Sequence, residues 1–398
     1  MVIPKRFTKN FKRSPQLIPY GRQWVDSDDI KEVVSVLKSD WLTQGPKVKQ
    51  LEHKLTELTG AKYAVCVSSA TAGLHLACLA AGIKRGDEVI TTPITFVASA
   101  NCVLYCQAKP IFADVSSDTI NIDPVEINKK ISKVTKAIIP VHFAGHPCQM
   151  EEIKEIAKKN NLIIIEDASH ALGAAYKNSK IGSGSYSDMT VFSFHPVKQI
   201  SAGEGGAVLT NNKKYYTRLL ILRDHGIIRM NKLKKDHGKK NYQGWIYQMQ
   251  SLGFNYRLSD IHSALGLSQL RKLSKFIRMR RKIAQEYIRE LSFIQEIILP
   301  EEKQYAKSAW HIFYLRLVDS KKRSMLYSNL QKLNIGAQIH YIPVYHHPFY
   351  RSKFGYKKGL CKNAEDYYQS TVTIPLFPKM TVKQKNYVLK VIKLFFSK

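Results

Sequence analysis

Acidic side chains and long apolar runs are both scarce in this sequence of 398 residues. The 31 Asp and Glu residues stand against 62 Lys and Arg residues, which gives a formal net charge of +31. No apolar run approaches the length that a membrane-spanning helix needs. The basic N-terminus, MVIPKRFTKNFKRSPQ, also lacks the apolar stretch of a secretory signal. We therefore expect a cytoplasmic protein that makes no use of a membrane.

Cysteine pairs of the CxxC type are absent as well. Cys102 and Cys106 have a helical i, i+4 spacing but no histidine beside them. The six cysteines lie mostly in apolar surroundings, at Cys66, Cys78, Cys102, Cys106, Cys148 and Cys361. This pattern is typical of buried thiols in a reducing compartment. We expect neither disulfides nor a metal site.

The positive charge raises the question of nucleic-acid binding. The lysines are spread over the whole chain, with two local concentrations, the N-terminal arm and RMNKLKKDHGKK at residues 229–240. The arm has only Phe7 and Phe11 as stacking rings, and the second stretch has no aromatic residue. No helix-turn-helix or zinc signature is visible. Attraction of a small anionic substrate is the better explanation of the charge, and nucleic-acid binding is the weaker alternative.

Short apolar segments alternate with helical ones through the first two thirds of the chain. Helices are predicted over residues 26–38, 46–59, 72–81 and 96–106. Strands are predicted over residues 63–67, 88–91, 110–114, 137–141, 162–166, 190–193 and 206–210. Such an alternation indicates a large, mainly parallel sheet covered on both faces, and therefore an α/β fold.

The pattern changes near residue 259. A long helical region continues to about residue 291, followed by a strand at 310–318, a helix at 324–333 and a strand at 335–340. These elements predict a smaller α+β domain. We divide the chain into a basic arm (1–17), a large domain (18–258), and a linking helix with a small C-terminal domain (259–398).

Lys198 lies in the segment SFHPVKQISAGEGG, between an apolar strand and a glycine-rich turn. An enzyme that forms an imine needs an amine in a desolvated site, where the charged form is less favoured. Taken alone, a lysine at such a place more often belongs to a solvated loop.

Asp167 makes a site more probable, because it ends the apolar strand of IIIEDASHALG. Carboxylates are rarely buried without a partner, and strand ends line the ligand crevice of open α/β sheets. A carboxylate is also what pairs with the ring nitrogen of pyridoxal phosphate (PLP). A helix cap is the competing role of Asp167. His170 either contacts the cofactor, orders Asp167, or is a core histidine.

Two further segments suit the same cofactor. SSAT, with Ser69, Ala70 and Thr71, precedes a helix whose N-terminus could bind a phosphate, with Ser193 as a further donor. Phe96 in TTPITFVASAN follows a strand and could stack on a flat ring. Helix capping and core packing are the ordinary alternatives.

Together these segments resemble the DegT/DnrJ/StrS-type sugar aminotransferases, a branch of the fold-type I PLP enzymes. The resemblance runs from about residue 18 to the C-terminus. Its strongest motifs are EDASHALG, SFHPVKQISAGEGG, RDHG at residues 223–226, and GFNYRLSDIHSALGLSQL at residues 253–270. Within the family, WLTQGP, TTPITFVASAN and QIHYIPVYHHPFY resemble the UDP-sugar C4 aminotransferases of pseudaminic acid synthesis.

The resemblance implies a PLP aminotransferase that moves an amino group from L-glutamate to C4 of a UDP-linked 4-keto-6-deoxy-N-acetyl sugar. It implies Lys198 as the Schiff-base lysine, Asp167 on the pyridine nitrogen, and Ser69, Ala70 and Ser193 near the phosphate. Asn255 would reach the cofactor of a neighbouring subunit, which implies a homodimer. The residues implied for the sugar-nucleotide site are Tyr20, Trp41, Leu42, Thr43, Gln338, Ile339, His340 and Tyr341.

The sequence departs from these relatives in its basic arm and in the polar stretch 229–250. Both could border the substrate entrance, so another nucleotide-linked keto-sugar, 3-keto or dTDP-linked, is the alternative substrate. A PLP-dependent sugar dehydratase is a further alternative. The resemblance argues against it, because those relatives carry histidine where this chain has Lys198.

Overall fold

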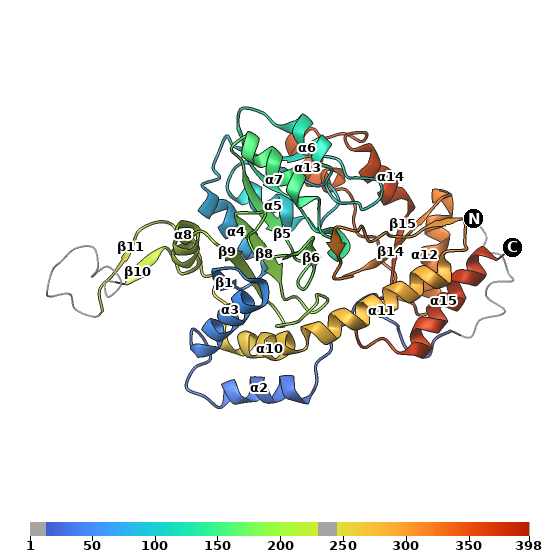
Figure 1. The fold of residues 1–398 in the computed structure, drawn as a ribbon, viewed down its shortest axis with the longest axis horizontal. Helices are drawn as coiled ribbons and strands as arrows, with labels where there is room; N and C mark the ends of the chain where they lie inside the picture. The colour runs from blue at the N-terminus through green and yellow to red at the C-terminus, as the bar shows by residue number, and fades with distance from the viewer. Residues whose placement is uncertain (1–12, 230–244, 398) are drawn as a thin grey trace.

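The computed structural model describes residues 13–229 and 245–397 (Figure 1). Most of the predicted basic arm and most of the stretch 229–240 lie outside the described residues. A seven-stranded sheet forms the centre, in the order β1-β9-β8-β5-β4-β2-β3. The strands are β1 (Tyr63–Val67), β2 (Glu88–Thr91), β3 (Lys109–Phe112), β4 (Thr135–Ile139), β5 (Ile163–Asp167), β8 (Met189–Ser193) and β9 (Gly206–Thr210). The seven strands predicted between residues 63 and 210 are all present, within two residues of their predicted ends.

The sheet is parallel except at one strand. β9 runs antiparallel to both of its neighbours, β1 and β8, whereas the pairs β8–β5, β5–β4, β4–β2 and β2–β3 are parallel. The mainly parallel sheet confirms the prediction. Its consequence for the site is geometric, because the carboxyl ends of parallel strands meet at one edge.

Helices bury both faces of the sheet, which is why its strands are apolar at successive positions. Val65 and Val67 of β1 pack into a core with α4 (Ala70–Ala81), α5 (Ala98–Tyr105) and α8 (Lys213–Arg223). Cys66, between them, points into the opposite core. The helices of that core are α3 (Pro46–Thr59), α7 (Met150–Lys159), α10 (Asp260–Arg271) and the first turns of α11 (Leu273–Leu291).

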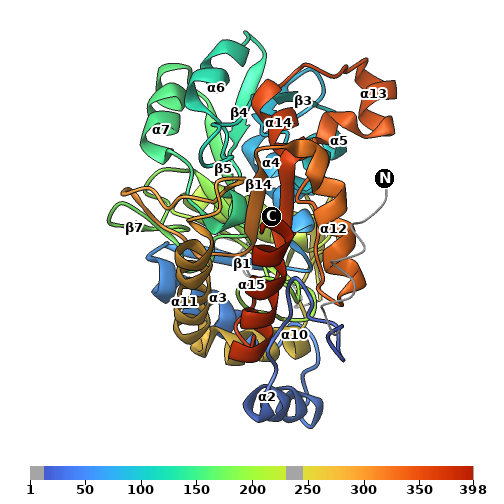
Figure 2. The same ribbon diagram turned by 90° about the vertical axis from the view of Figure 1, so that its right-hand side faces the viewer.

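The C-terminal part has its own sheet and core (Figures 1 and 2). β12 (Ile297–Ile298), β14 (Phe313–Leu317) and β15 (Thr371–Ile374) form an antiparallel sheet. It packs with α11, α12 (Arg323–Lys332) and α15 (Val382–Phe396). Ile18 belongs to this core, although it lies at the start of the chain. The division at residues 17 and 258 stays a prediction.

One prediction for this part was wrong. Residues 335–340 form no strand, because only Ile335 and Gln338 make isolated bridges, to Ile18 and Thr373. The long helical region is present as predicted and consists of two helices, since α10 ends at Arg271 and α11 begins at Leu273. The break turns the chain between the two cores, which a continuous apolar pattern does not reveal.

The remaining elements lie outside these two sheets. The helices are α6 (Pro124–Lys130), α13 (Pro348–Phe354), α14 (Lys362–Ser370) and the short η1 (Phe143–Gly145), η2 (Ser320–Lys322) and η3 (Val344–His346). The short strands are β6 (Ala175–Tyr176), β7 (Ser179–Lys180), β10 (Ile227–Arg229), β11 (Tyr247–Met249) and β13 (Ala306–Lys307). All six cysteines are buried free thiols, as predicted. Among the described helices, none has the length and apolarity to span a bilayer.

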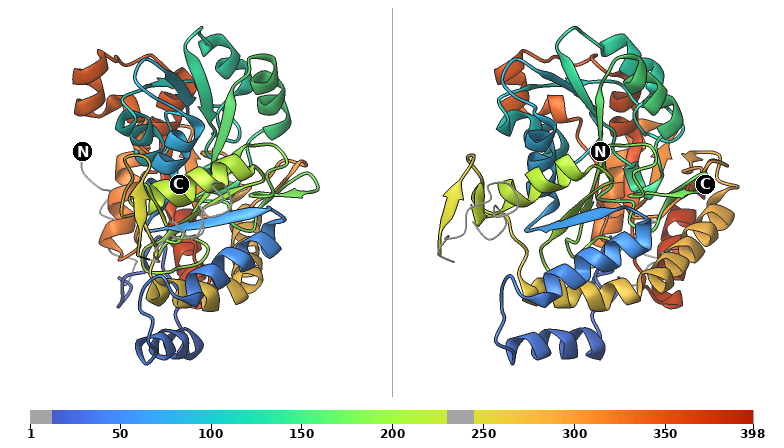
Figure 3. Two further views of the ribbon diagram at one scale, coloured as in Figure 1. Left: turned by 90° about the vertical axis from the view of Figure 1, so that its left-hand side faces the viewer. Right: turned by 60° about the vertical axis from the view of Figure 1, so that its left-hand side comes forward.

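Helix α2 (Ser27–Leu37) lies at the edge of the molecule beyond α10 (Figures 1 and 3). Asp26 caps it and accepts from the N–H groups of Asp28 and Asp29, as its sequence suggests. Most of its apolar side chains are turned away from the body: Ile30 is 58% exposed and Leu37 55%. Asp29 and Val36 are the buried residues of the helix and face inward. Periodicity found the helix but could not show which face contacts the body.

Candidate active site

Lys198 follows β8 in a turn at the carboxyl edge of the sheet, where its N–H donates to the His195 carbonyl (2.9 Å). Burial lowers the pKa of Lys198 to about 8, against the opposing effect of the Asp167 charge and with help from Arg280. A lysine with such a pKa loses its proton readily near neutral pH, as an amine nucleophile or base must.

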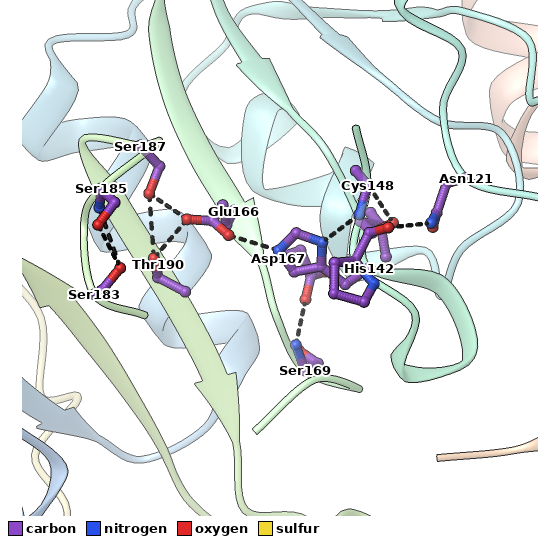
Figure 4. A network of polar contacts seen from close by, with 12 residues as sticks. Asn121, His142, Cys148, Glu166, Asp167, Ser169, Ser183, Ser185, Ser187 and Thr190 are labelled. Atoms are coloured by element: carbon purple, nitrogen blue, oxygen red, sulfur yellow. Dashed lines mark hydrogen bonds and ion pairs between the residues drawn. The ribbon is translucent and has the colours of Figure 1, made fainter. Parts of the chain in front are cut away.

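Asp167 ends β5 and is buried, with a relative exposure of 5%. Its Oδ2 accepts a hydrogen bond from the Ser99 hydroxyl (2.6 Å), and its Oδ1 accepts from the Ser169 N–H (3.1 Å; Figure 4). These bonds fix the orientation of the carboxylate. Ser99 comes from α5 and was not singled out in the sequence, because nothing local marks its partner 68 residues away.

Glu166 points to the opposite side of the sheet from Asp167, as neighbours on a strand must. His142 Nε2 lies 2.6 Å from the Glu166 carboxylate, and the Ser187 and Thr190 hydroxyls donate to it (Figure 4). Burial works to raise the pKa of Glu166, but these hydrogen bonds outweigh it and lower the pKa. Because the Cys148 N–H donates to His142 Nδ1, the ring proton lies on Nε2. This network anchors the strand that carries Asp167.

His170 lies beside Lys198 in a group of buried rings. Its centroid is 4.2 Å from that of His311, and Tyr341 Oη is 3.3 Å from its Nε2. Burial, together with the Lys198 charge, holds the pKa of His170 well below its usual range, so the imidazole is neutral. Burial likewise lowers the pKa of His340 to about 4. His311 was missed in the sequence, where it lies near the start of the strand predicted over residues 310–318.

The predicted substrate residues Tyr20 and His340 lie in this region too. Their ring centroids are 5.2 Å apart, and His340 Nδ1 is 2.9 Å from the Thr373 hydroxyl. Ile339 is partly buried and Gln338 is exposed. Phe96 is 58% exposed, with its ring 6.4 Å from that of Tyr341. An exposed ring beside the site is available to a ligand, in contrast to a core phenylalanine.

The predicted phosphate site lies at the N-terminus of α4. Ser69 caps the helix, its hydroxyl accepting from the Ala72 N–H (3.1 Å), and Ala70 and Thr71 form the first turn. A Cβ at Gly206 would lie 2.7 Å from the Ala70 nitrogen, so only glycine lets β9 approach this turn. Ser193 is buried, and its Oγ accepts from the His195 N–H (3.4 Å).

The other predicted residues lie elsewhere. Trp41 and Thr43 line an open cavity of about 1050 Å³ between α3, α8 and β10, together with Arg257. Leu42 is 46% exposed, and its carbonyl accepts from the Asp260 N–H. Asn255 is exposed, with its backbone paired to Asp224. No contact within the described part of the chain joins these residues to Lys198.

The residues around Lys198 fit pyridoxal phosphate. A readily deprotonated lysine, a buried carboxylate and an open helix N-terminus are the groups that its aldehyde, ring nitrogen and phosphate need. The Nδ1 atoms of His170 and His311 are buried without a hydrogen-bond partner among the described residues. Unpaired polar atoms of this kind are costly and mark a place where a ligand adds bonds.

Similarity to known proteins supports a PLP site in this chain. The chain is similar to the UDP-4-amino-4,6-dideoxy-N-acetyl-beta-L-altrosamine transaminase of Campylobacter jejuni subsp. jejuni, at 38% identity over 377 residues, covering 94% of this chain and 96% of the relative. It is also similar in structure to Helicobacter pylori PseC, an aminotransferase involved in the biosynthesis of pseudoaminic acid. That likeness has a TM-score of 0.88 and 32% identity, and covers 96% of this chain and 99% of PseC.

Solved structures of Streptococcus pneumoniae Spr1654 in PLP and PMP forms are similar as well. They have TM-scores of 0.87 and 0.88 at 28% identity, and cover 95% of this chain and 98% of theirs. These neighbours confirm the predicted fold-type I class and the PLP dependence. The DegT/DnrJ/EryC1/StrS aminotransferase family matches residues 23–393. The chain therefore belongs to this family of PLP-dependent sugar aminotransferases.

Proposed function

We propose that the protein moves an amino group from L-glutamate to C4 of a UDP-linked 4-keto-6-deoxy-N-acetyl sugar, in the cytoplasm. The observation that carries the proposal is the partly buried Lys198, which senses the charge of Asp167, in a chain similar over nearly its whole length to a transaminase named for such a sugar. The net charge of +31 suits a substrate with two phosphates.

In this proposal Lys198 is the catalytic base and acid. Pyridoxal phosphate, when bound, supplies an electron sink for the charge left when a substrate carbon loses its proton. Lys198 Nζ takes that proton in the glutamate half-reaction and moves one in the reverse direction in the sugar half-reaction. A pKa of about 8 suits both directions near neutral pH.

Other residues hold the reactants in this proposal. Asp167, held in place by hydrogen bonds from Ser99 and Ser169, pairs with the pyridine nitrogen, and the first turn of α4 holds the phosphate. Neutral His170 orders this side of the site. Since it carries no charge, it does not compete with the ring nitrogen for Asp167.

A second candidate for the sugar is suggested by the cavity that contains Trp41. Ile227 and Ile228 of β10 line the cavity that contains Trp41, and the polar stretch 229–250 begins where β10 ends. Residues implied in sugar binding thus share a cavity with β10, the strand that leads into that stretch. Another nucleotide-linked keto-sugar, 3-keto or dTDP-linked, is therefore the second candidate.

A substrate panel tests the proposal. The purified protein is incubated with L-glutamate and UDP-4-keto, dTDP-4-keto or dTDP-3-keto sugars, and amino-sugar and 2-oxoglutarate are measured by mass spectrometry. We expect equal amounts of both products with the UDP-linked N-acetyl sugar and a much smaller kcat/KM with the others. A preference for a dTDP or 3-keto sugar would support the second candidate.

We further propose a homodimer, supported by the outward apolar side of α2. Ile30, Val34 and Leu37 are 58%, 38% and 55% exposed at helical spacing, and such a patch usually meets a partner. Placing a charge there with Val34→Glu should shift the mass measured by light scattering from dimer to monomer. Lys31→Glu, on an exposed residue of the same helix, is the matched control and should stay dimeric. A wild-type monomer would contradict the proposal.

A further inference from the structure

Arg280 in α11 is fully buried, with 0% relative exposure, and contacts the chain behind Lys198. One amino group, Nη1, donates to the carbonyls of His311 (2.9 Å), Leu376 (3.1 Å) and Trp310 (3.3 Å). The other, Nη2, lies 3.4 Å from the Lys198 carbonyl and 3.5 Å from that of Val197. One guanidinium therefore touches three separate segments at the site.

These segments all carry groups of the site. The His311 ring contacts that of His170 at a tilt of 36°, and the Leu376 N–H donates to the Tyr20 carbonyl (3.0 Å). The contacts to the Lys198 turn are long for hydrogen bonds, so their effect is mainly electrostatic. The shorter contacts anchor the guanidinium, and the planar fork of arginine is what allows it to reach both sides.

No acidic side chain pairs with Arg280 among the described residues; its partners are all carbonyl groups. Its Nε is buried and also unpartnered there. Burial lowers the pKa of Arg280 to about 10, which still leaves it charged at neutral pH. A buried charge without a counter-ion is costly to stability, and an apolar side chain of similar size would avoid that cost.

We infer that Arg280 is a positioning residue for Lys198, which fixes the Lys198 turn against the C-terminal segments and keeps a positive charge beside the site. The inference rests on the proposed role of Lys198. A cation near a lysine favours the neutral amine that can act as nucleophile and base. The unpaired charge thus has a use that an apolar residue could not supply.

The other charged and titratable groups around Lys198 set the direction of this effect. Burial lowers the pKa of Lys198 first, Asp167 raises it, and Arg280 lowers it. The Lys198 charge also acts on four histidines, whose pKa values are all lowered, mainly by burial. They are His170, His195, His311 and His340. Glu204 acts on His195 in the opposite direction. Asp167 and Arg280 are therefore the two fixed charges that oppose each other at Lys198.

Two substitutions separate charge from geometry. Arg280→Met removes both, whereas Arg280→Lys keeps the charge and loses the fork. The first readout is a pH titration of the absorbance of the purified holoenzyme. The absorbance reports the protonation of the nitrogen that joins Lys198 to the cofactor. We expect the midpoint to move up by several tenths of a pH unit in Arg280→Met and to stay near the wild-type value in Arg280→Lys.

The second readout is the glutamate half-reaction. Both variants should lose about 10- to 100-fold in kcat with a small change in KM, because the lysine is misplaced in each. Arg289→Met, the same change at a residue of α11 with a side chain 73% exposed, should match wild type in both readouts.

Unchanged kcat and midpoint in folded Arg280→Met, as in Arg289→Met, would overturn the inference. If Arg280→Met does not fold, Arg280→Lys decides, and a wild-type kcat in that variant overturns the positioning role. A different result would contradict the proposed function. In that case the Lys198→Ala variant would keep its cofactor absorbance band and its turnover, whatever the Arg280 variants do.

Discussion

The side chains around Lys198 and those around Trp41 differ in how far a single chain encloses them. Asp167 and His170 are buried, hydrogen-bonded and within reach of the lysine. Trp41 is 57% exposed, in an open cavity that contains no residue of the Lys198 turn. The first region is preorganised for chemistry within one chain. The second has the exposure expected of residues that act on a large ligand or across a subunit contact.

The largest expected effect is at Lys198. Lys198→Ala should reduce transamination by more than about 10³-fold, because the chemistry loses both its nucleophile and its proton carrier. Product formation under single-turnover conditions measures the loss. Lys136→Ala, at an exposed position of β4, is the control and should keep full activity. Activity above a few per cent of wild type in Lys198→Ala would contradict the assignment of the chemistry to the Lys198 region.

Asp167 should come next. Asp167→Asn keeps the shape of the side chain but removes its charge, so we expect about a 100-fold loss in kcat. Ser99→Ala, which removes only the 2.6 Å hydrogen bond to Oδ2, should lose about 10-fold. Steady-state kinetics with glutamate gives both values. A Ser99 variant as damaged as the Asp167 variant would mean that the hydroxyl acts directly.

Stability should also distinguish the two regions. The pKa of Lys198 is about 8 in the folded chain against 10.5 for an unburied lysine, so the unfolded chain binds more protons between these values. The burial of Lys198 therefore has its full destabilising effect on the cofactor-free protein below pH 8, and this effect decreases as the pH rises to 10.5.

Lys198→Met should accordingly stabilise the cofactor-free chain at pH 7 by on the order of 2 kcal/mol, with no gain at pH 10.5. Urea unfolding at the two pH values measures this. Lys49→Met, at an exposed lysine of the cavity, should change stability little at either pH. Equal gains at both pH values would contradict the lowered pKa.

The smallest effect is expected at Trp41. Trp41→Ala should raise KM for the sugar nucleotide about 3- to 10-fold and leave the glutamate half-reaction unchanged, because an exposed ring contributes to binding alone. Phe293→Ala, another exposed ring at 65%, is the control. A fall in the glutamate half-reaction would show that the cavity and the Lys198 site are one unit.

The sequence predicted those features that depend on residues close together in the chain. The strand Tyr63–Val67 and the helix Pro46–Thr59 have the predicted ends, because apolar runs and Gly60 mark them. Asp167 was found because a carboxylate at the end of a buried strand is unusual. Ser99 and Arg280 escaped notice because their contacts join residues 68 and 82 positions apart. The outward face of α2 was hidden for a similar reason.

The most direct test locates the lysine that holds the cofactor. The holoenzyme is reduced with borohydride, digested, and mapped by mass spectrometry for the peptide that carries the added pyridoxyl group. The account predicts one modified peptide, with the group on Lys198. A modified lysine elsewhere in the chain, or no modified peptide from a protein that has PLP bound, would contradict it.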